Sequence, residues 1–258
     1  MTLSLAGRTI LVTGATQGIG EAIARAAVEA GAAGVALTGR QAARGEALAA
    51  EFGRSARSIF VAGELGEEAD CRRIVTTASD RLGVIDGLVN AAGLTDRGHV
   101  EDTSVALWDR LFAVNVRAPF ILTQEVVRRL KSAGRPGAIV NIITQSSHGG
   151  QPFLTAYSAS KGALATLTRN NAHALRGARI RVNGLNIGWT DTPGEHAIQA
   201  RDGRPPDWLQ VAERAQPFGR LIKPADVATA AVYLLSEAAE MMTGALIDFD
   251  QNVVGAYD

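Results

Sequence analysis

The sequence alternates short apolar runs with longer segments of helical periodicity along nearly its whole length. The apolar runs are expected to be strands at 9–12, 35–38, 59–62, 87–90, 138–143, 180–185 and 245–249. The segments between them are expected to be helices at 21–30, 42–52, 68–82, 107–131 with an interruption at Pro119, 156–175 and 224–235. Continuous apolar strands between amphipathic helices are typical of a parallel sheet that is covered on both faces. The pattern predicts an α/β fold, a doubly wound parallel sheet of about seven strands, in a single domain spanning 1–258.

Composition excludes several classes of protein. The 26 basic and 26 acidic residues cancel, so nothing indicates a nucleic acid or an acidic membrane surface as partner. Cys71 is the only cysteine, which excludes an intrachain disulfide, and the four histidines lack the spacing of metal ligands. No apolar run approaches the ~20 residues of a membrane span. Residues 1–7 lack the basic lead and apolar run of a signal peptide. We expect a cytoplasmic protein that binds no metal and acts on a small molecule.

A tyrosine and a lysine stand four residues apart in the segment that begins at 156. On a helix, Tyr157 and Lys161 would lie one turn apart on the same face. A free phenol has a pKa of about 10, and a neighbouring ammonium group lowers the pKa of such a phenol. A phenol tuned in this way can exchange a proton near neutrality, which the interconversion of an alcohol and a ketone requires. The alternative is a surface pair, because short motifs recur by chance.

A glycine-rich turn directly follows the first expected strand. Gly14, Gly18 and Gly20 would let the backbone approach a pyrophosphate, while the following helix supplies N–H donors and a partial positive charge. A plain tight turn is the alternative. At the start of a repeating β/α pattern, however, the turn predicts a dinucleotide-binding site.

Four motifs in order resemble the short-chain dehydrogenase/reductase superfamily, in its subfamily of about this length. They are Thr13-Gly14-x-x-x-Gly18-x-Gly20, Asn90-Ala91-Ala92-Gly93, Asn115 and Tyr157-x-x-x-Lys161. The resemblance implies a Rossmann-like fold and hydride transfer between a nicotinamide cofactor and a secondary alcohol or ketone. It also implies a homo-oligomer, either a tetramer or a dimer, built on the helices at 107–131 and 156–175.

The resemblance also implies the roles of individual residues. The catalytic set is Asn115, Thr144, Tyr157 and Lys161. The cofactor-binding set is Gly14, Thr16, Gln17, Gly18, Ile19, Gly20, Arg40, Glu64, Leu65, Asn90, Ala91, Gly93, Tyr157, Lys161, Ile187 and Thr192.

The chain departs from the family pattern at several of these positions. Arg40 stands after the second strand, where an acidic residue usually selects NAD. A guanidinium there can pair with a 2′-phosphate, so NADP(H) is favoured; NAD(H) is the alternative if Arg40 only faces solvent. Thr144 replaces the usual serine, with Ser146 as the alternative catalytic hydroxyl. Glu64 replaces the usual aspartate near the adenine, and Ile187 replaces a proline.

The span 188–217 is predicted to be a lid over the substrate that contains one or two short helices. It carries four of the eight prolines together with Trp189 and Trp208. The expected substrate-binding residues are Thr144, Gln145, Ser146, Ser147, His148, Gln151, Tyr157, Trp189, Glu195 and His196.

This polar set suits a sugar or a polyol better than a steroid or a fatty chain. A small apolar ketone or a 3-oxoacyl substrate is the alternative. Two other classes stay open: a sugar epimerase or dehydratase, and a non-catalytic protein that senses NADP or acts as a scaffold.

Overall fold

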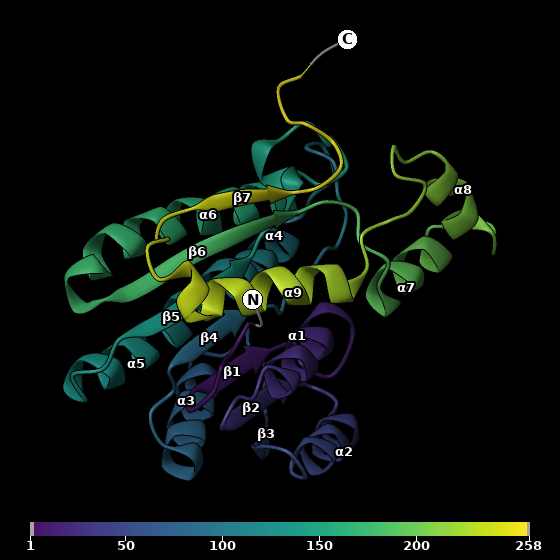
Figure 1. The fold of residues 1–258 in the computed structure, drawn as a ribbon. Coiled ribbons are helices and arrows are strands. Elements are labelled where there is room, and N and C mark those ends of the chain that lie inside the picture. Colours follow the sequence, from purple (N-terminus) through teal and green to yellow (C-terminus); the bar gives the residue numbers. More distant parts are fainter. Residues whose placement is uncertain (1–2, 257–258) are drawn as a thin grey trace.

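The computed structural model describes residues 3–256 and contains one sheet of seven parallel strands (Figure 1). The strand order is β3-β2-β1-β4-β5-β6-β7. Strands β2 and β3 are added on one side of β1 and the later strands on its other side, so the order of addition reverses between β1 and β4, which pair in parallel. The strands are β1 (Thr9–Thr13), β2 (Gly34–Gly39), β3 (Arg57–Ala62), β4 (Gly87–Asn90), β5 (Gly137–Ile142), β6 (Ile180–Ile187) and β7 (Leu246–Phe249). The predicted doubly wound parallel sheet is therefore confirmed. Residues 1 and 2, within the segment considered for a signal peptide, lie outside the described residues.

The helices agree with the predicted segments, except in the cause of the break between α4 and α5. They are α1 (Gly18–Glu29), α2 (Ala42–Phe52), α3 (Glu68–Leu82), α4 (Val105–Phe112), α5 (Ala118–Ser132), α6 (Thr155–Leu175), α7 (Pro193–Arg201), α8 (Trp208–Arg214) and α9 (Pro224–Leu235). The expected interruption by Pro119 is wrong. Pro119 lies in the first turn of α5, where its missing N–H has no helical partner to lose. The break between α4 and α5 is a π-helical turn, Ala113–Arg117.

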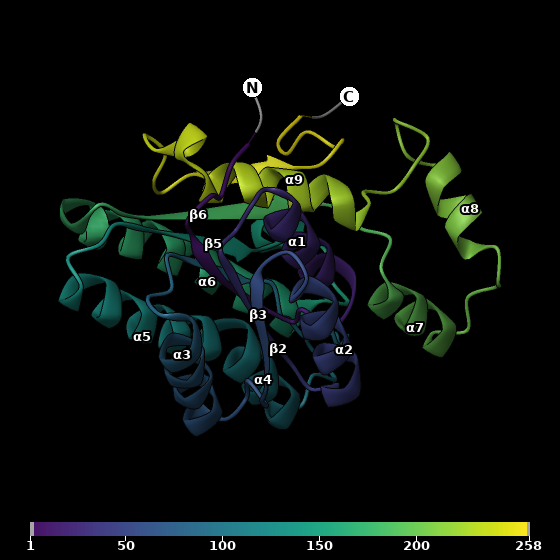
Figure 2. The same cartoon turned by 60° about the horizontal axis from the view of Figure 1, so that its bottom comes forward.

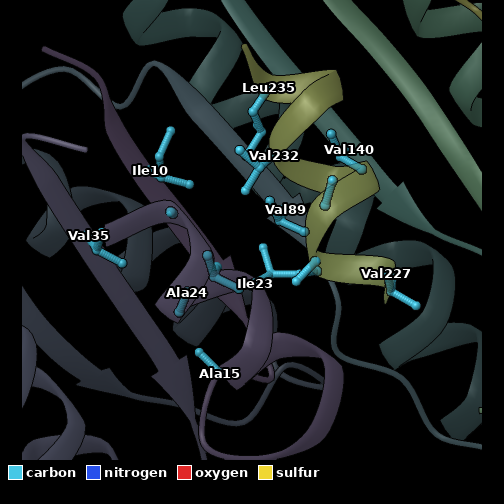
Figure 3. Packing of buried hydrophobic residues seen from close by; sticks show 14 of the residues in the cluster. Ile10, Ala15, Ile23, Ala24, Val35, Val89, Val140, Val227, Val232 and Leu235 are labelled. Carbon is cyan, nitrogen blue, oxygen red and sulfur yellow. The ribbon is translucent and has the colours of Figure 1, made fainter. Parts of the chain in front are cut away.

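Side chains of the strands alternate between two apolar cores, one on each face of the sheet. Ile10 and Val12 of β1 belong to the core beneath α1, α2 and α9, whereas Leu11 belongs to the core beneath α3 and α5. Figure 3 shows Ile23 of α1 and Val232 of α9 above the first face. Burying each such aliphatic side chain stabilises the fold by about 1.5–3 kcal/mol. The two cores fix the positions of the strands. They therefore also fix the position of the sheet edge where the carboxyl ends of the strands meet.

The helices α7 and α8 stand beyond that edge. In Figures 1 and 2 they project from the body of the molecule, on the side toward which the strand arrows point. Trp208 and Ala212 of α8 form a small separate core with Leu221. The prediction of one or two short helices within 188–217 is confirmed. No helix among residues 3–256 has the length and apolar character needed to cross a membrane.

Candidate active site

A cleft of about 910 Å³ opens at the carboxyl edge of the sheet. Its walls come from the turns after β1, β2, β3 and β4, from the start of α6, and from the segment that carries α7 and α8. Parallel sheets with helices on both faces bind ligands along this edge. The expected catalytic and cofactor-binding residues can therefore be located relative to one continuous space.

Tyr157 and Lys161 lie one turn apart on α6, and both side chains are buried in the floor of the cleft. Lys161 Nζ lies 5.9 Å from the centroid of the Tyr157 ring. It donates a hydrogen bond of 2.8 Å to the carbonyl oxygen of Ile142, at the end of β5. The ammonium group is thus fixed between the sheet and the phenol.

The expectation that Lys161 lowers the pKa of the phenol is wrong for the folded chain. Burial raises the pKa of Tyr157 to about 12, and the charge of Glu195 raises this pKa further, while a hydrogen bond with Thr144 acts in the opposite direction. Burial also lowers the pKa of Lys161 to about 8. Desolvation dominates because Tyr157 and Lys161 are only 9% and 4% exposed, a burial that a sequence pattern cannot reveal.

Of the two candidate hydroxyls, that of Thr144 lies beside the phenol. Its hydrogen bond with Tyr157 lowers the pKa of the phenol. Its Oγ1 lies 3.3 Å from Ser146 Oγ and accepts the Ser146 N–H at the start of a short 3₁₀ turn. The Ser146 hydroxyl in turn donates to the side-chain oxygen of Gln151. The hydroxyl of Ser146 is therefore already engaged by Thr144 and Gln151.

Asn115 is fully buried in the π-helical turn and does not itself line the cleft. Its Nδ2 donates to the carbonyl oxygen of Leu94 (2.9 Å) and to Ser160 Oγ (3.0 Å), while its Oδ1 accepts the N–H of Leu94 (2.9 Å). These bonds hold the segment after β4 against α6, beside Lys161. Single π-helical turns occur often at functional sites, because the extra residue redirects a side chain.

The glycines of this turn are required by the close packing of the chain against itself. Gly14 has a φ of +64°, and a Cβ atom there would lie 2.9 Å from the Cα of Ala92. A Cβ at Gly20 would lie 2.3 Å from the carbonyl oxygen of Gly14. The side chain of Gln17 does not cap α1, so the first N–H groups of this helix remain available at the cleft. These features fit a pyrophosphate.

The far end of the cleft is formed by the residues after β2 and β3. Arg40 is exposed there, and its guanidinium has no acidic partner within residues 3–256. Glu64 and Leu65 follow β3 and line the same end, where Glu64 Oε1 accepts the N–H of Gly66 at 3.5 Å. An unpaired guanidinium beside a groove for a dinucleotide fits a 2′-phosphate.

Most of the predicted cofactor-binding residues line this cleft. They are Gly14, Thr16, Gln17, Gly18, Ile19, Gly20, Arg40, Glu64, Leu65, Ala91, Gly93, Tyr157, Lys161, Ile187 and Thr192. Asn90 does not line it, because its side chain points into the sheet and donates to Asn141 Oδ1 (2.8 Å).

The predicted substrate-binding residues divide into two groups. Thr144, Gln145, Ser146, Gln151, Tyr157, Trp189 and Glu195 line the cleft. Ser147, His148 and His196 do not. The two histidines lie instead 3.0 Å from Asp248 and 2.7 Å from Asp191, respectively.

Several lining residues had no signal in the sequence. They are Arg97, Phe153, Gln199 and Arg204. All come from loops or from the segment 188–217, whose paths no periodicity predicts. Among residues 3–256, no group of three or more His, Cys, Asp or Glu side chains could hold a metal ion.

Charged pairs tie the segment 188–217 to the loop after β4. Arg97 and Asp96, in the loop after β4, lie opposite Asp202 and Arg201 at the end of α7. Arg97 pairs with Asp202 at 2.5 Å, and Asp96 pairs with Arg201 at 3.4 Å.

A parallel sheet with a glycine-rich turn after its first strand is typical of a dinucleotide-binding protein, and the buried Tyr–Lys pair lies in the same cleft. The family model described as enoyl-(acyl carrier protein) reductase matches residues 14–251. Together with the relatives below, this match shows that the chain belongs to the short-chain dehydrogenase/reductase superfamily.

Two curated relatives and one solved structure illustrate the similarity. The NADP-dependent (R)-specific alcohol dehydrogenase of Lentilactobacillus kefiri is 34% identical and aligns over 95% of this chain and 96% of its own. The sorbitol dehydrogenase of Cereibacter sphaeroides is 34% identical, over 96% and 98%. A 3-oxoacyl (acyl-carrier-protein) reductase from Agrobacterium tumefaciens C58, solved with NADP bound, has a TM-score of 0.88 and 27% identity, over 98% and 96%.

Proposed function

We propose that the protein is an NADP(H)-dependent oxidoreductase that interconverts a secondary alcohol and a ketone. One observation carries this proposal: the buried Tyr157–Lys161 pair, with Thr144 beside the phenol, shares a single cleft with the glycine-rich turn. The alcohol and sorbitol dehydrogenases among the relatives support the same reaction class.

NADP(H) is the cofactor that fits the cleft. The turn Gly14–Gly20 and the start of α1 would hold the pyrophosphate, and Arg40 would pair with the 2′-phosphate. Ile187 and Thr192 would bind the nicotinamide carboxamide, and Lys161 the adjoining ribose. The NADP-dependent relative and the NADP-bound reductase support this choice.

The bound nicotinamide supplies a hydride, or accepts one, and carries a positive charge when oxidised. The chain's own residues handle the oxygen and its proton. Thr144 and Tyr157 donate hydrogen bonds to the substrate oxygen, where negative charge grows during reduction. Tyr157 then gives up its proton. Lys161, whose pKa lies at about 8, can exchange a proton with its surroundings near neutrality and so restore the phenol.

The direction of reaction sets which form of the phenol is needed. Reduction uses the protonated phenol, which the raised pKa of Tyr157 favours. Oxidation needs the phenolate form of Tyr157, which can accept a proton from the alcohol. The rate of oxidation should therefore rise with pH below the pKa of Tyr157.

The test is Tyr157→Phe, with Tyr233→Phe as its matched control. Tyr233 lies on α9 and its hydroxyl contacts Met242 Sδ (3.3 Å), outside the cleft. Tyr157→Phe should reduce turnover by at least ~100-fold, as expected when a general acid–base group is lost. NADPH binding, followed by fluorescence, should stay nearly unchanged in both variants. Near-normal turnover in Tyr157→Phe would remove the phenol from the reaction.

We also propose how the rest of the chain serves this activity. Residues 1–258 form a single catalytic domain in which 188–217 is a lid. The chain forms a homo-oligomer, a tetramer or dimer, through α4, α5 and α6. The partly exposed rings of Trp108 and Phe120 on α4 and α5 support this interface, and light scattering of the purified protein tests it. We place the protein in the reducing cytoplasm, where the buried free thiol of Cys71 is stable.

A further inference from the structure

Glu195, on the lid helix α7, places a carboxylate in the cleft that contains Tyr157. We propose that Glu195 determines substrate class: it accepts a hydrogen bond from a hydroxyl of a neutral polyol and repels substrates that carry a carboxylate. This inference rests on the proposed function, since it concerns the substrate of the same site.

The carboxylate is held in a fixed position. The N–H of Glu195 donates to Oγ1 of Thr192, the residue that caps α7, at 3.1 Å. Its Oε1 accepts Trp189 Nε1 at 2.9 Å and Gln199 Nε2 at 2.5 Å. A carboxylate has about four acceptor sites, and within residues 3–256 these side-chain bonds all go to Oε1. Oε2 therefore keeps acceptor capacity for a donor on the substrate.

The nearby cation does not neutralise Glu195. Arg97 lies 3.8 Å from Oε1 of Glu195 but makes its short pair, 2.5 Å, with Asp202. Two carboxylates thus share one guanidinium. Asp250, after β7, adds a further acidic group to the lining, while Arg204 lies exposed at the rim. Because Lys161 also lines the cleft, its acidic and basic groups are about balanced. The carboxylate of Glu195 itself therefore opposes an anionic group placed beside it and favours a hydroxyl donor.

The remaining walls suit a polyhydroxylated chain. Trp189 and Trp208 stack with their ring centroids 6.0 Å apart, and both line the cleft. Their faces offer apolar contact to C–H groups. The amides of Gln151 and Gln199 border the same space and offer donors and acceptors to hydroxyls. Apolar faces with a few fixed polar groups are the usual composition of a selective small-molecule pocket.

The charge of Glu195 also reaches the reacting phenol, whose pKa it raises. Within residues 3–256, the other charged groups near the phenol and Glu195 are Lys161 on α6, Arg97 and Asp202, together with Asp250 and Arg204 of the cleft lining. Removing the Glu195 charge should therefore lower the pKa of Tyr157 and shift the pH profile of alcohol oxidation toward lower pH. A residue that only supported the lid would not produce this shift.

The experiment compares polyols of four to six carbons with the aldonates of the same chain length, using NADP⁺. Each pair differs at one end, CH₂OH against COO⁻. The variants are Glu195→Gln, Glu195→Asp and, as matched control, Asp202→Asn, which removes the other carboxylate paired with Arg97 but lies outside the cleft lining. Thermal unfolding and NADPH binding verify that each variant is folded.

We expect the wild type to prefer the polyol. In Glu195→Gln, kcat/KM for the polyol should fall by at least about tenfold, as for a lost hydrogen bond to a charged group, and kcat/KM for the aldonate should rise. Glu195→Asp should keep the wild-type preference. Asp202→Asn, which leaves Arg97 to Glu195 alone, should weaken that preference much less than Glu195→Gln does. An unchanged preference in Glu195→Gln, or an equal change in Asp202→Asn, would overturn the inference.

Two further outcomes separate the inference from the proposed function. A wild type that oxidises aldonates, amino alcohols or apolar alcohols in preference to polyols would overturn the role of Glu195 and leave the oxidoreductase activity standing. A wild type that oxidises none of these alcohols would overturn both.

Discussion

The buried ammonium group of Lys161 should make the active site costly to fold. Burial lowers its pKa from 10.5 to about 8, a difference of about 2.5. At 1.36 kcal/mol for each pKa unit, the charged side chain destabilises the folded protein by about 3 kcal/mol at pH 7. We therefore predict that Lys161→Met, although inactive, will lose little stability at pH 7, because removing the charge offsets the lost hydrogen bond to Ile142.

The pH dependence isolates this charge. Below pH 8, Lys161 is charged in both the folded and the unfolded chain, so the penalty is fully present. Between pH 8 and 10.5 the folded chain releases its proton first, and the unfolding free energy of the wild type rises with pH. In Lys161→Met this rise is absent. Relative to the variant, the wild type should gain about 3 kcal/mol over this range.

Urea unfolding followed by tryptophan fluorescence measures both proteins from pH 7 to 10.5. Lys131→Met, at an exposed position on α5, is the control and should follow the wild type at every pH. Parallel curves for Lys161→Met and the wild type would refute the reasoning, because they would show that burial does not displace the titration of this lysine.

Two further changes test the site. Arg40→Ala should weaken NADPH binding roughly ten- to a hundredfold, the range for lost charge-assisted hydrogen bonds, and leave NADH binding unchanged in a fluorescence titration; equal losses for both cofactors would argue against a 2′-phosphate contact. Thr144→Val should lower kcat about 10²- to 10³-fold, as for a lost donor to a developing oxyanion, whereas Ser146→Ala should cause a much smaller loss in the same assay. The reverse order would make Ser146 the catalytic hydroxyl.

The sequence predicted the sheet well, because buried parallel strands leave a strong apolar signal. The segments 42–52, 68–82 and 224–235 match α2, α3 and α9 to the residue. The sequence did not predict the π-helical turn Ala113–Arg117. The interruption was expected at Pro119, but the proline fits the first turn of α5.

The site was predicted less completely, because burial and the direction of side chains depend on the three-dimensional surroundings of each residue. The raised pKa of Tyr157 depends on burial, which the spacing to Lys161 does not encode. Asn90 ends a strand as expected, but its side chain turns toward Asn141. Arg97 and Phe153 reach the cleft from loops, where no period predicts direction.

The paired charges between the loop after β4 and the end of α7 have a kinetic consequence. Asp96 and Arg97 each contact an opposite charge at the end of α7, so movement of α7 away from this loop would have to separate two ion pairs. Such partly exposed pairs weaken as salt is added, since the screening length is about 10 Å at 0.1 M. Higher ionic strength should therefore shorten the time for which product stays bound. If product release limits turnover, turnover should increase in concentrated salt.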